Sequence, residues 1–269
     1  MSNSRYSAQS MEAVDPLETM PPAKKSMVIL FLVDTSKSME GSKLESLNKV
    51  MGDILPELIG VGEAGTDVKA AVMSFSSGCE WITPEPVLIE EFQRWENLTA
   101  DGVTDLGEAC EELAAKLSRN AFLRSPSLSY APVIFLITDG YPTDNYKKGF
   151  EMLKRNRWFQ YGLKIALAIG SNVDMDVLRE FTDDEELVLQ ACGAEMLKKL
   201  VREIAVTSSK IGSTSMTLTD ARGERSLEDV AGAKKEQMIE AVQEMKQDIL
   251  GVDDLSDLSD LDIEFDEGW

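Results

Sequence analysis

The stretch Leu30–Gly41, LFLVDTSKSMEG, decides how the rest of the chain is interpreted. It completes the apolar run MVILFLVD, which starts at Met27 and is typical of a strand buried on both faces of a parallel sheet. The run ends in Asp34, and a threonine, two serines and a lysine follow with no apolar residue among them. A carboxylate and three hydroxyl groups at the end of a buried strand suggest metal chemistry, provided that further oxygen ligands occur elsewhere in the chain.

Apolar runs alternate with amphipathic stretches over most of the chain. Strands are predicted at 27–34, 67–77, 132–139, 163–170 and 186–191, with a proline-containing edge strand or hairpin arm at 80–91. Helices are predicted from Ser42 to Leu58, from Asp105 to Leu117, over 144–159 and over 195–206. Because strands that alternate with helices form βαβ units, the pattern predicts a three-layer, doubly wound α/β fold with a mostly parallel six-stranded sheet.

Composition divides the chain into five segments. Residues 1–25 show no periodicity and are predicted to form a disordered arm, whereas the α/β pattern fills residues 26–210. Residues 211–233 are rich in Ser, Thr, Gly and charge, which predicts a linker, and residues 234–250 form an amphipathic helical pattern. Residues 251–269 hold eight acidic residues and no basic one, so we expect a partly disordered acidic tail.

Charge and residue types exclude several classes of function. The chain of 269 residues carries a net charge of −21, from 48 acidic against 27 basic residues, and is therefore a poor candidate for gripping nucleic-acid phosphates. It suits divalent cations and basic protein surfaces better. The sequence has no histidine, which excludes Ser-His-Asp triads, Cys-His pairs, HExxH zinc sites and His-ligated iron.

The cysteines and the apolar runs bear on location. Cys79, Cys110 and Cys192 are widely spaced and odd in number, so they form neither a disulfide framework nor a CxxC zinc pair. We expect free thiols in a reducing compartment. No apolar run reaches the roughly 18–20 residues of a membrane span, and the first residues lack a hydrophobic signal core. The sequence therefore predicts a cytoplasmic protein without membrane contact.

Further oxygen ligands for the Asp34 loop do occur. A second buried run, PVIFLITD, ends in Asp139, and DGVTDLGEA places Thr104 in a loop just before a helix. Because ligands of open α/β sheets bind outside the carboxyl ends of the strands, we expect these three loops to meet. With Ser36 and Ser38 they supply hard oxygen donors of the kind that Mg²⁺ takes in octahedral geometry together with waters. If hydroxyls do most of the direct coordination, the ion keeps positive charge and attracts an external carboxylate.

The three pieces resemble a known site. DTSKS, the threonine of VTDLGEA and the TDG after a strand, in this order and spacing, resemble the metal-ion-dependent adhesion site of von Willebrand factor A domains. The resemblance covers residues 26–210 and implies a doubly wound sheet and a Mg²⁺ ion, or sometimes Mn²⁺, completed by a ligand carboxylate. It also implies hydroxyl ligands at Ser36, Ser38 and Thr104, with Asp34 and Asp139 anchoring the ion, partly through waters.

Within that family, LVDTSKSMEGSKLESLN and FLITDGYPTD look most like the bacterial TerY-like group. Those proteins are associated with tellurite and stress resistance and with phage-defence gene clusters, and are thought to scaffold partners that include kinases and phosphatases. The resemblance thus implies a protein partner that presents an acidic residue to the metal. Many such domains have Gly where Lys37 stands; Lys37 either faces solvent or helps to grip an acidic ligand. Tyr141, after the TDG turn, either rims the site or packs on its own helix.

The acidic tail carries an apolar stripe of its own. Its members fall at helical spacings of 3, 3, 4 and 4 and are Leu255, Leu258, Leu261, Phe265 and Trp269. On a helix they cover about 120°, with acidic residues on the remaining surface. The tail is either solvated and disordered or a docking element that folds on a basic, apolar groove.

Three functions are compatible with these patterns. The first, which the five oxygen ligands favour, is a non-enzymatic protein-interaction module that binds its partner through Mg²⁺. The second is a metal-dependent phosphatase or hydrolase with Asp34 as nucleophile, but a haloacid-dehalogenase phosphatase would need a second acid where Ser36 stands, and no histidine is present as a base. The third is an adaptor with a structural metal, whose recognition is confined to the tail.

Overall fold

Strand β1 (Lys25–Asp34) lies at the centre of the fold. Nine of its ten residues are buried, and it pairs in parallel with β2 (Thr66–Ser76) on one side and β5 (Val133–Thr138) on the other. The prediction of a strand buried on both faces is therefore confirmed. Because alternate side chains of a strand point to opposite faces, β1 contributes to the two hydrophobic cores that flank the sheet.

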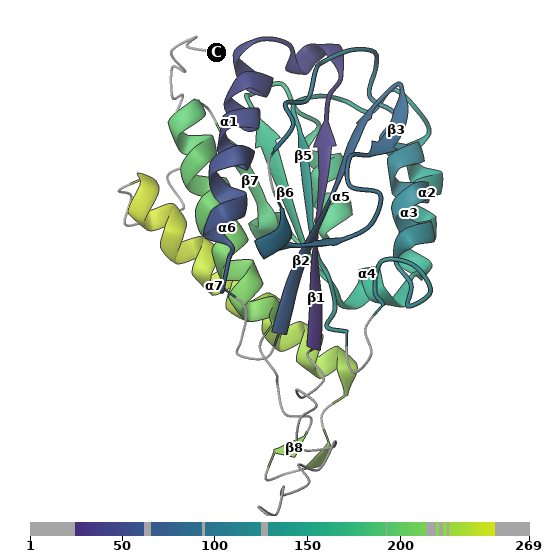
Figure 1. The fold of residues 1–269 in the computed structure, drawn as a ribbon, viewed down its shortest axis with the longest axis vertical. Helices are drawn as coiled ribbons and strands as arrows, with labels where there is room; N and C mark the ends of the chain where they lie inside the picture. The colour runs from purple at the N-terminus through teal and green to yellow at the C-terminus, as the bar shows by residue number, and fades with distance from the viewer. Residues whose placement is uncertain are drawn as a thin grey trace, which may run out of the picture.

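The computed structural model describes residues 25–61, 66–92, 95–124, 129–191, 193–213, 219–220, 223–224 and 226–250. The acidic tail and the predicted N-terminal arm, apart from Lys25, lie outside the described residues. Figure 1 shows a central sheet with α1, α6 and α7 on one side and α2, α3 and α4 on the other. The predicted three-layer α/β architecture is thus confirmed.

The strand order is β3-β2-β1-β5-β6-β7, with β4 also pairing with β2. The further strands are β3 (Gly78–Trp81), β4 (Val87–Leu88), β6 (Leu163–Ile169) and β7 (Val188–Ala191). All pairs are parallel except those of β3 and β4 with β2. The segment predicted as one arm at 80–91 forms two short strands, since Pro84 and Pro86 between them lack the amide hydrogen of a ladder. Among the residues that the structure describes, the sheet therefore has seven strands rather than six.

The α-helices differ in detail from the predicted ones. They are α1 (Ser42–Glu57), α2 (Leu106–Lys116), α3 (Tyr146–Arg155), α4 (Arg157–Tyr161), α5 (Met175–Thr182), α6 (Ala194–Ser213) and α7 (Leu227–Leu250). The helix predicted over 144–159 is two helices, because the side chain of Asn156 accepts a hydrogen bond from the amide of Trp158 and caps α4. Helix α5 has no counterpart in the sequence prediction.

Short elements complete the chain. Three 3₁₀ turns lie at η1 (Lys37–Met39), η2 (Ile89–Glu91) and η3 (Glu185–Leu187), and a two-stranded ladder is formed by β8 (Thr219–Asp220) and β9 (Gly223–Glu224). Turn η1 directly follows the end of β1, so it belongs to the loop on which the predicted site rests.

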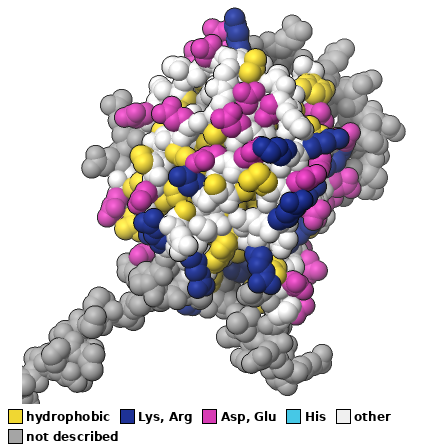
Figure 2. All heavy atoms as spheres, turned by 90° about the vertical axis from the view of Figure 1, so that its right-hand side faces the viewer, with side chains coloured by type: hydrophobic (Ala, Val, Ile, Leu, Met, Phe, Trp, Pro, Cys, Tyr) yellow, Lys and Arg dark blue, Asp and Glu magenta, His cyan; other side chains and the backbone are white. Residues whose placement is uncertain are grey.

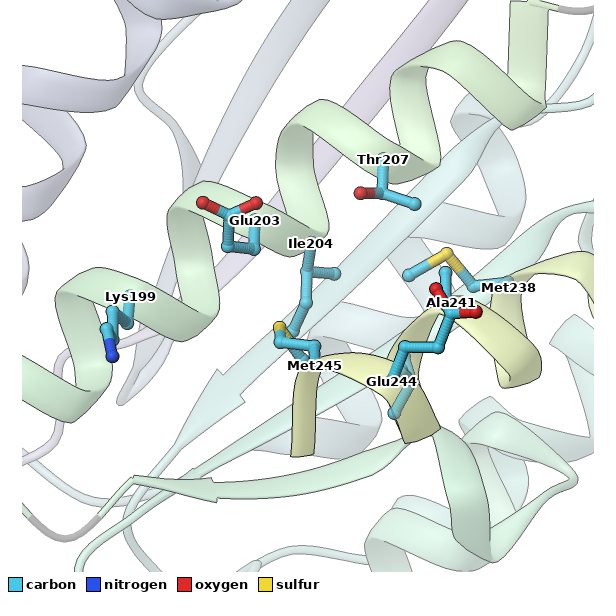
Figure 3. Close-up of a pocket in the computed structure, with 9 residues that line it drawn as sticks. Lys199, Glu203, Ile204, Thr207, Met238, Ala241, Glu244 and Met245 are labelled. Atoms are coloured by element: carbon cyan, nitrogen blue, oxygen red, sulfur yellow. The ribbon is translucent and has the colours of Figure 1, made fainter. Parts of the chain in front are cut away.

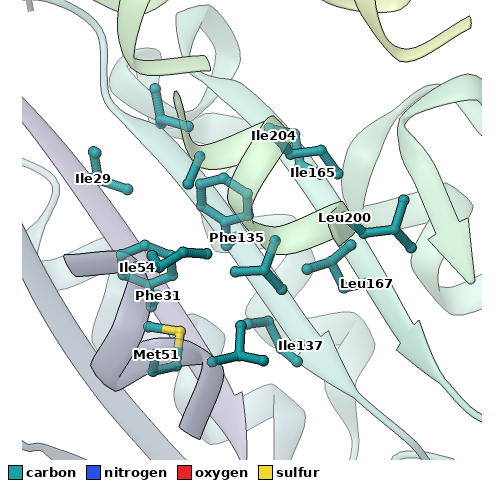
Figure 4. Close-up of a cluster of buried hydrophobic side chains, with 14 of the residues drawn as sticks. Ile29, Phe31, Met51, Ile54, Phe135, Ile137, Ile165, Leu167, Leu200 and Ile204 are labelled. Carbon is teal, nitrogen blue, oxygen red and sulfur yellow. The ribbon is translucent and has the colours of Figure 1, made fainter. Parts of the chain in front are cut away.

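One core lies between the sheet and the layer of α1, α6 and α7. Figure 4 shows Met51 and Ile54 of α1 against Phe31 of β1, with Leu200 and Ile204 of α6 closing the same space. The rings of Phe31 and Phe135 stack with their centroids 5.0 Å apart, which joins β1 to β5 through side chains as well as backbone. The apolar stripe predicted for α1 therefore faces the sheet.

The opposite core lies beneath α2, α3, α4 and α5. Phe181 of α5 packs against Phe150 of α3 and Phe159 of α4, with centroids 5.9 and 5.5 Å apart. The outside of this layer, which Figure 2 faces, carries acidic and basic side chains interspersed with scattered hydrophobic ones. Such a mixed surface is ordinary for the solvent side of amphipathic helices.

Helix α7 begins at Leu227, seven residues before the predicted start at Lys234. Ser226 caps it, because its hydroxyl accepts from the amide of Asp229 at 3.1 Å while the Asp229 carboxylate accepts from the amide of Ser226 at 2.9 Å. This reciprocal pair is a capping box with Asp in the third position. Met238 and Val242 are 1% exposed and belong to the core beneath α1 and α6. Helix α7 thus packs onto the same core as the helices before it.

We expect Met238→Ala to lower the free energy of unfolding by about 2–5 kcal/mol, because truncating a buried methionine removes apolar contacts and leaves a cavity. The neighbouring Gln237 is exposed, and Gln237→Ala should change stability by less than about 0.5 kcal/mol. Urea unfolding of both variants checks this. Equal stability of the two variants would show that α7 does not contribute to the core.

Candidate metal centre

Three loops meet at the carboxyl ends of β1 and β5. The two strands are parallel neighbours, so Asp34 at the end of β1 lies beside the end of β5, where Thr138 and Asp139 stand. The loop before α2 joins them through backbone hydrogen bonds, from Lys37 N to Gly102 O at 3.2 Å and from Asp101 N to Thr35 O at 2.9 Å. The strand order reverses between β1 and β5, and this is the position where open α/β sheets place ligands.

Asp34 is fully buried and held by neutral donors. Its Oδ1 accepts from the amide of Ser36 at 2.8 Å, and its Oδ2 accepts a short hydrogen bond from the hydroxyl of Thr138. Burial raises the pKa of this carboxyl above its ordinary value, and the charge of Asp139 acts in the same direction, while the hydrogen bonds from Thr138 and Ser36 oppose the rise. The site thus contains a desolvated carboxyl next to a second one.

The serines of the DTSKS loop connect the two aspartates. The hydroxyls of Ser36 and Ser38 lie 3.0 Å apart, and the hydroxyl of Ser38 donates to Oδ1 of Asp139 at 2.7 Å. Thr104 is buried close by: a Cβ placed on Gly140 would lie 3.5 Å from Oγ of Ser38 and 3.8 Å from Oγ1 of Thr104. The structure therefore brings all five sequence-predicted oxygen residues to one place.

Thr104 is fixed by Thr143, and the helix that follows Thr104 is fixed by Asp144. The amide of Thr104 donates to the hydroxyl of Thr143 at 3.0 Å, and its carbonyl accepts from the amide of Thr143 at 2.8 Å. Asp144 accepts from the amides of Gly107 and Glu108 at 3.0 and 3.1 Å, so it holds the first turn of α2, which follows Thr104. The loop after β5 thereby positions the loop before α2.

Lys43 is the functional candidate that the sequence analysis missed. Its Nζ lies 2.6 Å from Oδ2 of Asp139 and 3.4 Å from the carbonyl oxygen of Ser38. The Asp139 carboxylate has no exposed surface, whereas the Lys43 side chain is 25% exposed. Lys43 stands in the first turn of α1, directly after the DTSKS loop, and this position was the available signal. The ammonium places one positive charge against the carboxylate.

A shallow cavity of about 350 Å³ opens over these groups. Lys37 and Tyr141, the two rim candidates from the sequence, both line it, together with Val103 and Asn172. Tyr141 is 52% exposed, so its ring faces the mouth of the cavity rather than the core. Lys37 is exposed as well, which leaves its ammonium available above the cavity.

The donor set at the site consists of hydroxyl and carboxylate oxygens. Elsewhere in the described residues, no three His, Cys, Asp or Glu side chains lie together in a way that could hold a metal.

Cys110 is buried and Cys79 is half-buried, and both are free thiols, whereas Cys192 lies outside the described residues. Burial raises the pKa of Cys79 to about 11, and the nearby carboxylates of Glu108 and Glu112 act in the same direction.

We expect Cys79 to react slowly for a partly exposed thiol. With its pKa raised from 9.0 to about 11, the thiolate fraction near pH 8 is roughly 100-fold lower than that of an unperturbed thiol, and the rate should climb with pH up to about 11. Peptide mapping after iodoacetamide treatment gives the rate at Cys79. The same chain in urea is the control, and equal rates in both conditions would contradict the shift.

Comparisons with known proteins agree with this geometry. The model of the von Willebrand factor type A domain matches residues 29–203, which is more than half of the chain. Human inter-alpha-trypsin inhibitor heavy chain H6 is 26% identical over 211 residues, and bovine heavy chain H1 is 27% identical over 165 residues. These matches cover 70% and 56% of this chain but only 15% and 17% of the relatives.

Solved structures share the fold at low identity. The pilus adhesin SpaC from Lactobacillus rhamnosus GG superposes with a TM-score of 0.57 at 13% identity, covering 71% of this chain and 31% of SpaC. A von Willebrand factor type A protein from Catenulispora acidiphila superposes with a TM-score of 0.51 at 18% identity, covering 70% of this chain and 43% of that protein. Within the described residues, no helix is long and apolar enough to cross a membrane. On the match of the family model, the chain belongs to the von Willebrand factor type A domain family.

Proposed function

We propose that this chain is a metal-ion-dependent protein-interaction module that binds a carboxylate of its partner through Mg²⁺ or Mn²⁺. Members of the family are often metal-dependent adhesion or protein-interaction modules. The observation that carries the proposal is the convergence of three separated loops, which place two carboxylates and three hydroxyls around one cavity. In this proposal Ser36, Ser38 and Thr104 are hydroxyl ligands, and Asp34 and Asp139 hold the ion partly through waters.

The residues present fit such an ion. Hydroxyl and carboxylate oxygens are the donors that Mg²⁺ and Mn²⁺ prefer, and the chain has no histidine to favour zinc or copper. Lys43 supplies a further argument, because its ammonium already places a cation at 2.6 Å from Asp139. The buried carboxyls of Asp34 and Asp139 are accompanied by the ammonium of Lys43, which is only partly buried. Further positive charge at this point would therefore be stabilised by the two carboxyls. A bound ion would supply that charge and an open position for an external carboxylate oxygen.

The chain's own residues prepare this site. The amide of Ser36 and the hydroxyl of Thr138 fix the orientation of the Asp34 carboxylate, and the hydroxyl of Ser38 fixes that of Asp139. Rigid ligands lower the entropy cost of binding, because little rearrangement is needed. Lys37 and Tyr141 stand at the mouth, where they would contact the partner rather than the ion.

The setting proposed for this module is cytoplasmic, in a bacterial stress-response or defence system. It rests on the resemblance of LVDTSKSMEGSKLESLN and FLITDGYPTD to the TerY-like group, which also suggests kinase or phosphatase partners. The proposal includes no enzymatic activity. Three observations support a function without catalysis. The pKa of Cys79 is raised, the sequence has no histidine, and the relatives are described as inhibitor heavy chains.

We expect Ser38→Ala to weaken Mg²⁺ binding by roughly 10-fold or more, since it removes a ligand and the hydroxyl that orients Asp139. Isothermal titration calorimetry measures the affinity. Ser42→Ala is the matched control, because Ser42 lies four residues later, at the first position of α1, and is exposed. Unchanged Mg²⁺ affinity in Ser38→Ala would rule out the proposed ligand set.

Lys43→Met should have the opposite effect. Removing the ammonium from Asp139 frees the carboxylate for the ion, and because a hydrogen bond to a charged group contributes about 1.5–3 kcal/mol, we expect Mg²⁺ binding to tighten by roughly 10-fold. Lys49→Met, at an exposed position on the same helix, changes the net charge equally and should leave affinity within about twofold. Weaker binding in Lys43→Met would show that the lysine supports the ion rather than competing with it.

A further inference from the structure

The mouth of the ion site combines apolar and basic groups. Four large hydrophobic residues are exposed in the described part of the chain: Ile59, Val103, Tyr141 and Met152. Two of them, Val103 and Tyr141, line the cavity over the site, where Lys37 and Lys43 also lie. A ligand that matches this mouth offers one carboxylate at the centre, an apolar side chain beside it and further negative charge for the lysines.

The chain's own C-terminal tail has this chemistry. In VDDLSDLSDLDIEFDEGW, residues 252–269, aspartates and glutamates alternate with leucine, isoleucine and aromatic residues, and no basic residue occurs. Pairs such as Asp257 with Leu258 and Asp260 with Leu261 repeat every three residues. Several registers of the tail therefore present a carboxylate next to a leucine.

The tail is also long enough to reach the site. Figure 1 shows α7 rising from the foot of the sheet along α6, so that its C-terminal end is the end nearer to the edge where β1 ends. The 19 residues after Leu250 can extend over at most roughly 65 Å, while a domain of this size has a radius of gyration of roughly 17 Å. The tail can thus pass around the domain to its own ion site.

The groove between α6 and α7 is a poorer match. It is a cavity of about 390 Å³ beside which Ile204, Met238 and Met245 lie, as Figure 3 shows. Its polar lining includes the carboxylates of Glu203 and Glu244 and the ammonium of Lys199. Two carboxylates against one ammonium repel an acidic tail, so this groove does not suit the tail. The mouth of the ion site instead has two lysines, Lys37 and Lys43, against one carboxylate, that of Asp139, with which Lys43 is paired.

We propose that a carboxylate of the C-terminal tail occupies the ion site of its own chain as an internal ligand, with an adjacent leucine on Val103 and Tyr141. An external partner must then displace the tail. This inference rests on the proposed metal-dependent function. An internal ligand is favoured over a second copy, because a short tether holds the tail at an effective concentration of roughly millimolar.

The test uses the full-length, ¹⁵N-labelled chain and Mg²⁺. We expect saturable changes in the amide resonances of residues 253–267 as Mg²⁺ is added, with the midpoint that calorimetry gives for the site. The triple variant Asp257→Asn, Asp260→Asn and Asp262→Asn should lose much of this response, whereas Ser256→Ala with Ser259→Ala should keep it. Tyr141→Ser should weaken it, since the apolar contact is removed.

Each other outcome overturns a defined part of the proposal. The same response in Ser38→Ala would mean that cations bind the acidic tail directly, without the site. A response that falls on roughly tenfold dilution would assign the tail to the site of a second copy. Saturable Mg²⁺ binding with no change in the tail would remove the internal ligand and leave the proposed function standing. No saturable Mg²⁺ binding at all would overturn the proposed function, and the internal ligand with it.

Discussion

The site depends on the parallel pairing of β1 with β5. Their register pairs Val33 with Ile137, so the residues that follow, Asp34 on one strand and Thr138 on the other, meet at the end of the ladder. This pairing places the carboxyls of Asp34 and Asp139 close together, and both residues are at most 3% exposed. Two buried carboxyls repel each other and have lost their hydration, so the fold needs hydrogen-bond donors or positive charge at this point.

The two aspartates are compensated in different ways. Asp34 accepts from an amide and a hydroxyl, which are neutral and belong to its own loop and to the adjacent strand. Asp139 accepts from the hydroxyl of Ser38 and is paired with the ammonium of Lys43, which reaches it from a partly exposed position. The pair with Lys43 is therefore the exchangeable contact, since a flexible side chain at the rim can withdraw at lower cost than a backbone amide.

Much of the fold and of the site was predictable because the signals were local and strong. Continuous apolar runs that end in aspartate predicted β1 and β5, and the general position of ligands in open α/β sheets predicted that the loops would meet. Lys43 was missed because its partner lies 96 residues away in sequence, and the position of Lys43 after the DTSKS loop does not by itself show which carboxylate it contacts. The break between α3 and α4 was missed for a similar reason. Asn156 caps α4 and also donates to the carbonyls of Ala114 and Leu117 on a neighbouring segment. The position of the break between α3 and α4 therefore depends on tertiary contacts.

An internal ligand would set a minimum affinity that a partner must exceed. A tethered tail at an effective concentration of roughly 1 mM, with an intrinsic Kd of roughly 0.1 mM, would lower the apparent affinity of every competitor about tenfold. A partner that offers a lone carboxylate would then bind too weakly to compete. A partner that also contacts Tyr141 and Lys37 gains binding energy over more of the mouth and can displace the tail. The acidic tail would therefore raise the affinity that a partner needs in order to bind, while the ratio of affinities between partners would stay the same, because the tail acts by competition alone.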